Sequence, residues 1–262
     1  MLNKNVLDTI KNDNLFRWGR EQTTFSFFGP DTEELYKKNL INQPQDWYYR
    51  NNSVTYTCNK DSYRAPELDT IDWSSAVLLF GCSNTFGVGL DDKDTISAQL
   101  ESIIGLPVIN LGVGGSSNDL ILHNSTLFRD KGIIPKGVVH LWSIPQRTVL
   151  YQEENAINCG NWGPSESLLD YTKSWLNEHY NILARSLINY KLGKLIWQNT
   201  SASYYDLSVY KETATLLECD YIQQIDDARD VDGVSNHVGS SAHIGRRTAR
   251  IVAQKIADNL KL

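Results

Sequence analysis

Residues 77–89 constrain the fold of this chain more than any other stretch. They begin with a continuous aliphatic and aromatic run and stop abruptly in a turn of small, hydroxyl-bearing and glycine residues. Such a run, bounded by glycine, predicts a strand buried on both faces. The residues that follow, 92–104, carry apolar side chains at helical spacing. Ser83 is therefore predicted to lie where a buried strand passes into a helix.

The same alternation of strand and helix continues along the chain. Strands are expected at residues 76–80, 107–111, 137–142, 203–207 and 220–222, and helices at residues 92–104, 117–131, 166–195 and 242–260. Strands that alternate with helices predict right-handed βαβ units and a parallel sheet. In such a sheet, ligands and catalytic groups collect beyond the carboxyl ends of the strands. Ser83 is predicted at one of these ends.

The first part of the chain has a different character. It is rich in Asn, Asp, Tyr and Trp, with short extended segments and one predicted helix at residues 31–40. We expect residues 1–69 to form an extension that packs its aromatic rings on a main domain of residues 70–262. Trp47, Tyr48 and Tyr49 could line a sugar-binding surface. Core packing is the favoured interpretation, because large aromatic rings dominate burial in any fold.

Length and charge bound the possible functions. The 262 residues suffice for one large α/β domain with an appendage. A net charge of −6, with no basic cluster longer than Arg246-Arg247, argues against a nucleic-acid partner. No apolar run is long enough to span a bilayer, and residues 1–20 lack the apolar core of a signal peptide. We expect no membrane partner and a cytoplasmic location as made.

Glycine-rich turns after strands also occur in nucleotide-binding proteins. Gly112 and Gly114 begin a dinucleotide fingerprint, but Ser117 occupies the third glycine position, and the chain has no phosphate-binding Gly-Lys-Ser/Thr. The four cysteines form no CxxC pair, so neither a zinc site nor a disulfide framework is indicated. We expect no cofactor and no metal. The nucleophile elbow of α/β-hydrolases is missing as well, because Thr85 stands where it needs glycine.

Three separated elements nevertheless supply the parts of acyl transfer. Ser83 follows the first core strand, glycine amides follow the second, and His237 lies in an acidic loop before the last helix. Acyl transfer needs a hydroxyl nucleophile, amide donors for the oxyanion, and a base oriented by a carboxylate. His243, six residues after His237, is expected only at the start of that helix.

These motifs resemble the SGNH (GDSL-like) hydrolase family. In order they read Gly81-x-Ser83-x-Thr85-x-Gly87, Asn110-x-Gly112-x-x-Gly115, and the Asp/His loop before the C-terminal helix. The resemblance covers about residues 54–262. It implies a flavodoxin-like three-layer α/β/α sandwich with a central parallel sheet. It also implies ester hydrolysis, including removal of acetyl groups from carbohydrates, with a small-molecule or glycan ester as substrate.

The resemblance also implies roles for individual residues. Ser83 would be the nucleophile, and the backbone amides of Ser83 and Gly115 would form the oxyanion hole. His237 would be the general base, oriented by Asp232 or Asp230. In the family the carboxylate precedes the histidine by three residues, whereas these two precede it by five and seven.

Two departures from the family pattern affect the predicted site. Cys82 stands in place of the acid next to the serine, a change that need not alter the chemistry. The third motif, Gly-x-Asn-Asp, is missing, and residues 142–145 stand where its oxyanion-hole asparagine should lie. Losing one such donor costs about 10²–10³ in turnover. Either Ser143, Gln146 or Arg147 substitutes for it, or the activity is weak.

The missing asparagine motivates an alternative from a different functional class. The chain would then be a catalytically silent module of the same fold that binds carbohydrate or has a structural role. It would use the same crevice and the Trp/Tyr-rich surface. The retained Ser83 and His237 motivate the enzyme. The sequence does not decide between them, and it leaves the oligomeric state open.

Overall fold

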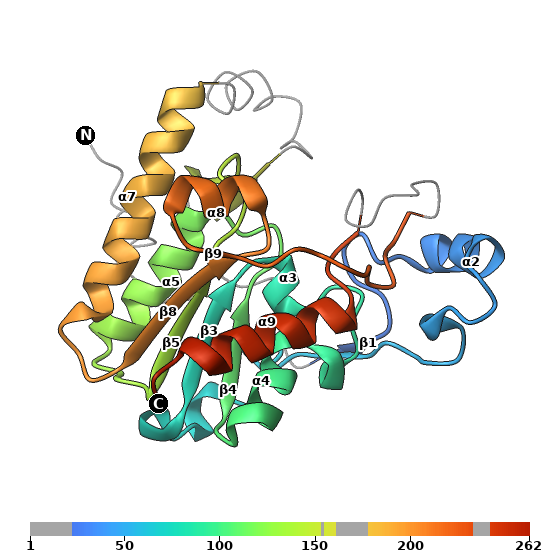
Figure 1. The fold of residues 1–262 in the computed structure, drawn as a ribbon, viewed down its shortest axis with the longest axis horizontal. Helices are drawn as coiled ribbons and strands as arrows, with labels where there is room; N and C mark the ends of the chain where they lie inside the picture. Colours follow the sequence, from blue (N-terminus) through green and yellow to red (C-terminus); the bar gives the residue numbers. More distant parts are fainter. Residues whose placement is uncertain (1–22, 153–154, 161–177, 233–241) are drawn as a thin grey trace.

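The central element of the computed structural model is a five-stranded parallel sheet (Figure 1). The structure describes residues 23–152, 155–160, 178–232 and 242–262. The strands are β3 (Val77–Gly81), β4 (Val108–Gly112), β5 (Gly137–Leu141), β8 (Ser203–Ser208) and β9 (Asp220–Tyr221). Their order, β4-β3-β5-β8-β9, is that of flavodoxin-like folds. The predicted fold class is confirmed.

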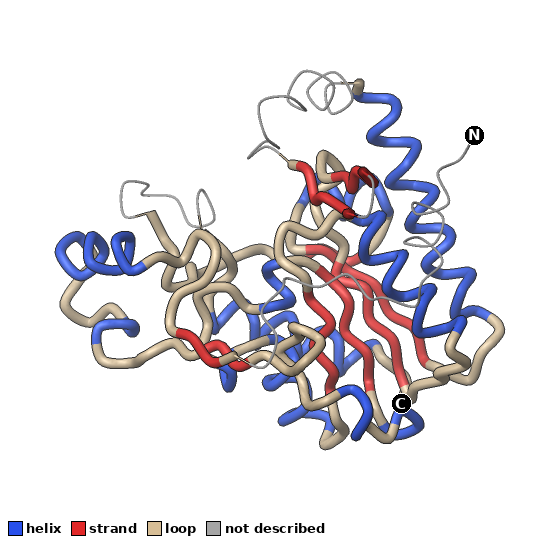
Figure 2. Tube along the Cα trace, turned by 180° about the vertical axis from the view of Figure 1, so that it is seen from behind, coloured by secondary structure: helices blue, strands red, loops and turns tan. Residues whose placement is uncertain are grey.

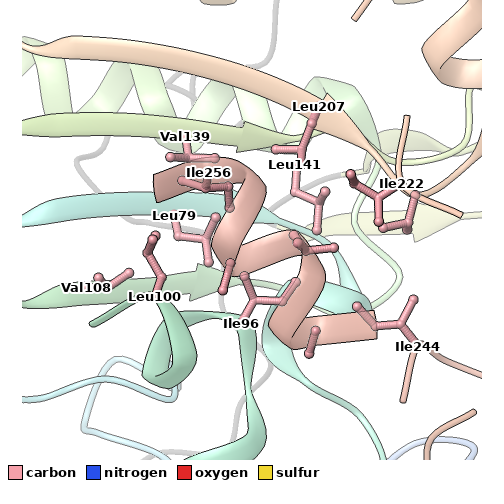
Figure 3. Packing of buried hydrophobic residues seen from close by; sticks show 14 of the residues in the cluster. Leu79, Ile96, Leu100, Val108, Val139, Leu141, Leu207, Ile222, Ile244 and Ile256 are labelled. Carbon is pink, nitrogen blue, oxygen red and sulfur yellow. The ribbon is translucent and has the colours of Figure 1, made fainter. Parts of the chain in front are cut away.

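Helices cover both faces of the sheet, as Figures 1 and 2 show. On one face α4 (Ile96–Ile104) packs against α9 (Arg246–Asn259), and on the other α5 (Asn118–Asp130) packs against α7 (His179–Gln198). Successive side chains of a strand point to opposite faces. Leu79 of β3 accordingly lies in the core under α4 and α9 (Figure 3), whereas Phe80 lies in the other core. β3 is therefore buried on both faces, as its apolar run predicts.

Several boundaries differ from the sequence-based expectation. The last helix begins at Arg246 rather than at residue 242, because Ile244 forms an antiparallel bridge with Asp227 that keeps the preceding segment extended. α7 begins at His179, and residues 166–177 of the expected helix lie outside the described residues. The unexpected elements include the strands β6 (Thr148–Gln152) and β7 (Asn155–Cys159) and the helix α8 (Lys211–Leu217).

Residues 23–67, called here the N-terminal segment, lie beside the carboxyl edge of the sheet. They contain β1 (Thr24–Phe25), α2 (Glu33–Asn42), the short helix η1 (Tyr48–Arg50) and β2 (Tyr56–Thr57), with β1 and β2 paired antiparallel. A third core cluster joins their aromatic rings to the main sheet domain: the Phe28 ring lies 5.0 Å from the ring of Phe86. Tyr49 is buried in this cluster, and Trp47 and Tyr48 pack against it. These contacts agree with core packing of the aromatic residues.

Candidate active site

Ser83 lies in a tight turn directly after β3. Cys82 is the N-cap of the one-turn helix α3 (Ser83–Phe86), and Gly87 ends this helix with a left-handed φ of 84°. α3 lies unusually close to the strand ends: a Cβ on Gly112 would be 2.3 Å from the Phe86 amide nitrogen. A side chain at Gly112 would displace the turn, so glycine at the end of β4 is required for the position of Ser83.

The turn after β4 is locked to the Ser83 turn. Asn110 of β4 donates from Nδ2 to the Thr85 carbonyl at 2.9 Å, and its Oδ1 accepts from the Gly112 amide at 3.0 Å. Gly115 follows with a left-handed φ of 66°. The elements that carry Ser83 and Gly115 therefore lie side by side at one sheet edge, where ligands bind in folds of this type.

A buried carboxylate and an imidazole form the third part of the site. His243 Nδ1 lies 2.6 Å from Asp230 Oδ2, and the His243 amide donates to Asp230 Oδ1 at 3.2 Å. The Asp230 side chain is fully buried and that of His243 is 17% exposed. Because Nδ1 is occupied by the carboxylate, Nε2 is the nitrogen left to exchange a proton.

Two opposing effects set the pKa of His243. Burial alone would lower it, because desolvation disfavours the charged imidazolium. The charge of Asp230 and its hydrogen bond outweigh burial and raise the pKa above the ordinary value of 6.5. His243 thus has the support of a carboxylate that a general base in acyl transfer requires.

Asn84 connects the segment that contains His243 to the turn that contains Ser83. Its Oδ1 accepts from the Ile244 amide at 3.1 Å, and its Nδ2 donates to the Tyr210 hydroxyl at 2.9 Å. One side chain thereby joins the residue after Ser83 to the residue after His243. The structure brings these two segments together although 160 residues separate Asn84 from Ile244.

The histidine of this pair is not the one expected from the sequence, whereas its acid, Asp230, is one of the two expected alternatives. His237 lies outside the described residues, so its expected role stays a prediction. The carboxylate of Asp232 is 45% exposed and binds Lys38 Nζ at 3.0 Å. Asp230, the other expected acid, binds His243 instead, which corrects our expectation that His243 only starts a helix.

Sequence reasoning missed this pairing for a physical reason. The bridge between Asp227 and Ile244 lies beside the pair and brings together two residues that are 13 positions apart in the sequence. No local spacing encodes such a contact. The one available signal is the position of His243 just before the last helix.

The turn after β5 holds the residues considered as substitutes for the missing asparagine. The Ser143 amide donates to Asn118 Oδ1 at 2.8 Å, so this amide is already engaged in a hydrogen bond and does not replace the asparagine as a donor. Arg147 donates from Nη1 to the Ser143 hydroxyl at 2.9 Å, and the same nitrogen lies 3.5 Å from the Ser116 carbonyl. Gln146 lies in the same turn and is partly exposed. Arg147 thus lies between the turns that follow β4 and β5.

The lowered pKa of the Cys82 thiol indicates a positive electrostatic potential near the carboxyl end of β3. Burial alone would raise the pKa of its thiol, but the Arg147 charge, the Asn84 amide, the Ser143 hydroxyl and the His243 charge outweigh burial and lower it below 9.0. Cys82 immediately precedes the serine. The charge of Arg147 therefore acts on the residue next to Ser83.

Comparisons with known proteins identify similar folds only at low sequence identity. No family model and no curated protein matches the chain. The chain is similar to the psychrotrophic esterase EstA from Pseudoalteromonas sp. at 10% identity and a TM-score of 0.39, covering 72% of this chain and 97% of that one. A member of the lipolytic protein G-D-S-L family from Veillonella parvula DSM 2008 gives 12% identity and a TM-score of 0.38, with 70% and 96% covered.

A third solved structure, AlinE4, is an SGNH-hydrolase family esterase with 14% identity and a TM-score of 0.31, covering 72% of this chain and 95% of that one.

Within the part of the chain that the structure describes, no helix has the length and apolarity needed to cross a membrane. Because the identities and TM-scores are low, we derive the function from the residues of the site.

Proposed function

We propose that the chain is a serine-dependent ester hydrolase of SGNH type, with Ser83 as nucleophile, His243 as general base and Asp230 as the acid that orients it. The observation that carries this proposal is the buried bond between His243 and Asp230. Asn84 ties that pair to the Ser83 turn. A nucleophile, a base and an orienting carboxylate from three separate segments are the parts that acyl transfer requires.

The proposed reaction has two steps. Ser83 Oγ attacks the acyl carbon while His243 Nε2 takes its proton, and Asp230 stabilises the imidazolium that forms. The amides of Ser83 and Gly115 donate to the oxyanion of the tetrahedral intermediate. Its collapse releases the alcohol, protonated by His243. Water, deprotonated by His243, then attacks the acyl-serine and releases the carboxylic acid, which restores Ser83.

Arg147 is the proposed third donor to the oxyanion. The Ser143 amide is bonded to Asn118, and the Ser143 hydroxyl is bonded to Arg147 and to the Cys82 thiol, which leaves Gln146 and Arg147 as the side chains of the turn that could donate. A guanidinium has five N–H donors, so it can hold the Ser143 hydroxyl and still donate to a developing oxyanion. Its charge reaches Cys82, next to the nucleophile. Arg147 would thus take over the task of the missing asparagine.

The proposed substrates are small acyl esters, acetyl esters and those of carbohydrates among them. The substrate class follows from the family resemblance, and a screen of acetyl esters against longer acyl esters tests it. The alternative is a catalytically silent module that binds carbohydrate. The absence of the oxyanion-hole asparagine at residues 142–145 favours this alternative.

A serine-hydrolase phosphonate probe tests the proposal without a known substrate. We expect wild type to be labelled, Ser83→Ala not to be labelled, and His243→Ala to be labelled at least about 100-fold more slowly. His237→Ala is the matched control and should retain the wild-type rate. Loss of labelling in His237→Ala but not in His243→Ala would assign the role of general base to His237 instead. Folded wild type that does not react, yet binds glycans, would favour the silent module.

A further inference from the structure

The N-terminal segment, residues 23–67, contacts both halves of the proposed active site. We propose that this segment positions the Asp230–His243 pair against the Ser83 turn, and that Asp31 and Asn39 are the positioning residues. This inference rests on the proposed function, because it concerns the geometry of the same site. Neither residue touches a reacting atom, so each acts through its neighbours.

Asn39 of α2 holds the backbone on both sides of the acid. Its Nδ2 donates to the Arg229 carbonyl at 3.3 Å and to the Val231 carbonyl at 2.5 Å. Asn39 is fully buried. These two carbonyls flank Asp230, so one side chain of the N-terminal segment sets the path of the backbone that presents the carboxylate to His243.

Asp31 holds the side chain of Arg229, the residue that precedes Asp230. Arg229 donates from Nε to Asp31 Oδ1 at 3.0 Å and from Nη2 to Asp31 Oδ2 at 2.8 Å. The two side chains are 4% and 1% exposed. A buried ion pair adds little net stability, because desolvation offsets the attraction. Two parallel hydrogen bonds do fix the orientation of the pair, which suits a positioning role.

The same network reaches the loop that follows the serine turn. The Tyr56 hydroxyl donates to Asp31 and accepts from the Gly89 amide at 2.7 Å. The Gly89 carbonyl in turn accepts from the Arg229 amide at 3.1 Å. A Cβ on Gly89 would lie 2.8 Å from the Arg229 nitrogen. The loop after α3 and the acid segment, residues 229–231, are therefore in direct contact. Tyr56 binds the loop, Asp31 binds the acid segment, and the two side chains bind each other.

Arg64 of the N-terminal segment holds the end of α3 itself. Its Nη1 donates to the carbonyls of Phe86 at 3.1 Å and Gly87 at 2.8 Å, and its Nη2 donates to the Leu90 carbonyl at 3.1 Å. Phe86 also packs against Phe28. The segment thus binds the serine turn through Arg64 and the acid segment through Asp31 and Asn39.

Small displacements at such a site have large effects on rate. A shift of about 1 Å in a catalytic group can lower the rate about 100-fold, because the reacting atoms leave their productive geometry. Active-site groups are held to about 0.5 Å by their supporting residues. The contacts of Asp31 and Asn39 lie within one residue of Asp230, where such a displacement would originate.

The test combines two variants with two readouts. Asn39→Asp is nearly isosteric but places an acceptor against two carbonyls, and Asp31→Asn leaves the Arg229 charge buried without its counterion. The tautomer of His243, read from ring ¹⁵N shifts, reports its bond to Asp230 independently of any activity. The phosphonate labelling rate reports the whole site. We expect both variants to lose the single Nδ1–H tautomer and to be labelled about 10–100-fold more slowly.

Two controls separate positioning from loss of stability. Lys38→Ala removes the exposed ion pair between α2 and Asp232 and should change neither readout. Phe128→Leu weakens the core on the face of the sheet that α5 and α7 cover. It should therefore lower the melting temperature but keep the tautomer and the labelling rate. Either variant serves alone if the other does not fold.

The outcomes distinguish this inference from the proposed function. Variants that are less stable but keep the tautomer, with labelling within about twofold of wild type, would overturn the inference and leave the segment a purely structural support. If wild type is not labelled but the variants still lose the tautomer, the proposed hydrolase fails and the positioning role stands.

Discussion

At the scale of single residues, the protonation of His243 governs the proposed chemistry. Its pKa lies above 6.5 because Asp230 outweighs the effect of burial. A general base acts in its neutral form, so the labelling rate should rise as the pH passes upward through this raised pKa. A rate profile of phosphonate labelling between pH 5 and pH 9 measures the position of this acid limb.

The variant Asp230→Asn tests the cause of that raised pKa. It removes the charge that favours the imidazolium and leaves burial, so the acid limb should move to lower pH. The rate at its plateau should fall about 10³–10⁴-fold, because the imidazole is no longer held in the required tautomer. The same pH profile measures both effects, and an unchanged acid limb would show that Asp230 does not act on the base.

Arg147 provides a second prediction at this scale. If its guanidinium donates to the oxyanion, Arg147→Met should lower kcat by about 10²–10³ with little change in KM, because the interaction forms in the transition state. Steady-state kinetics on an activated acetyl ester gives both constants. Gln146→Ala, in the same turn, is the matched control and should retain the wild-type kcat. A change confined to KM would assign Arg147 to substrate binding instead.

At the scale of elements, the close approach of α3 to the strand ends holds the serine. A Cβ on Gly112 would lie 2.3 Å from the Phe86 nitrogen and 2.8 Å from the Thr85 carbonyl carbon. Backbone atoms cannot yield as a flexible side chain can. Gly112→Ala should therefore displace α3, lower the stability by about 1–3 kcal/mol, and slow phosphonate labelling of Ser83.

Gly137→Ala is the control for this prediction. Gly137 begins β5, which pairs with the other side of β3, and the atoms nearest to a Cβ there belong to the Leu260 and Leu262 side chains, which can move aside. This variant should be labelled at the wild-type rate. Chemical denaturation and labelling measured on both variants separate displacement of α3 from a general effect of an added methyl group. Equal labelling of both would argue against the proposed contact.

At the scale of the whole molecule, a buried histidine in the sheet makes stability depend on pH. His140 in β5 is fully buried and contacts the Tyr204 hydroxyl and the Ser125 hydroxyl, each at 3.0 Å. Burial lowers its pKa from 6.5 to about 3. The unfolded chain therefore binds a proton below pH 6.5 that the folded chain does not bind until about pH 3.

The contribution of His140 to the free energy of unfolding is fully present above pH 6.5. It decreases by about 1.4 kcal/mol per pH unit as the pH falls toward 3. His140→Gln cannot take up this proton, so its stability should decrease less between pH 7 and pH 5 than that of wild type. Urea unfolding at both pH values measures the difference. Parallel losses in the two proteins would mean that other groups, rather than His140, control acid stability.

Much of the architecture could be predicted from the sequence. Leu78 and Leu79 point to opposite faces of β3 and both are buried, which a continuous apolar run implies. The strands around residues 203–207 and 220–222 were also expected. The helix α8 was not, because its seven residues are too few for a clear helical period.

The parallel sheet, its glycine-rich turns, and the positions of Ser83 and Gly115 after the strand ends can all be predicted from the sequence alone. These features depend on side-chain period and local backbone conformation, which neighbouring residues specify. The tertiary packing alone places Asp230 against His243, Arg147 near the Ser116 carbonyl of the turn after β4, and Asn39 against the carbonyls that flank Asp230. Each of these contacts joins residues at least 13 positions apart in the sequence, and the packing of the whole chain brings them together.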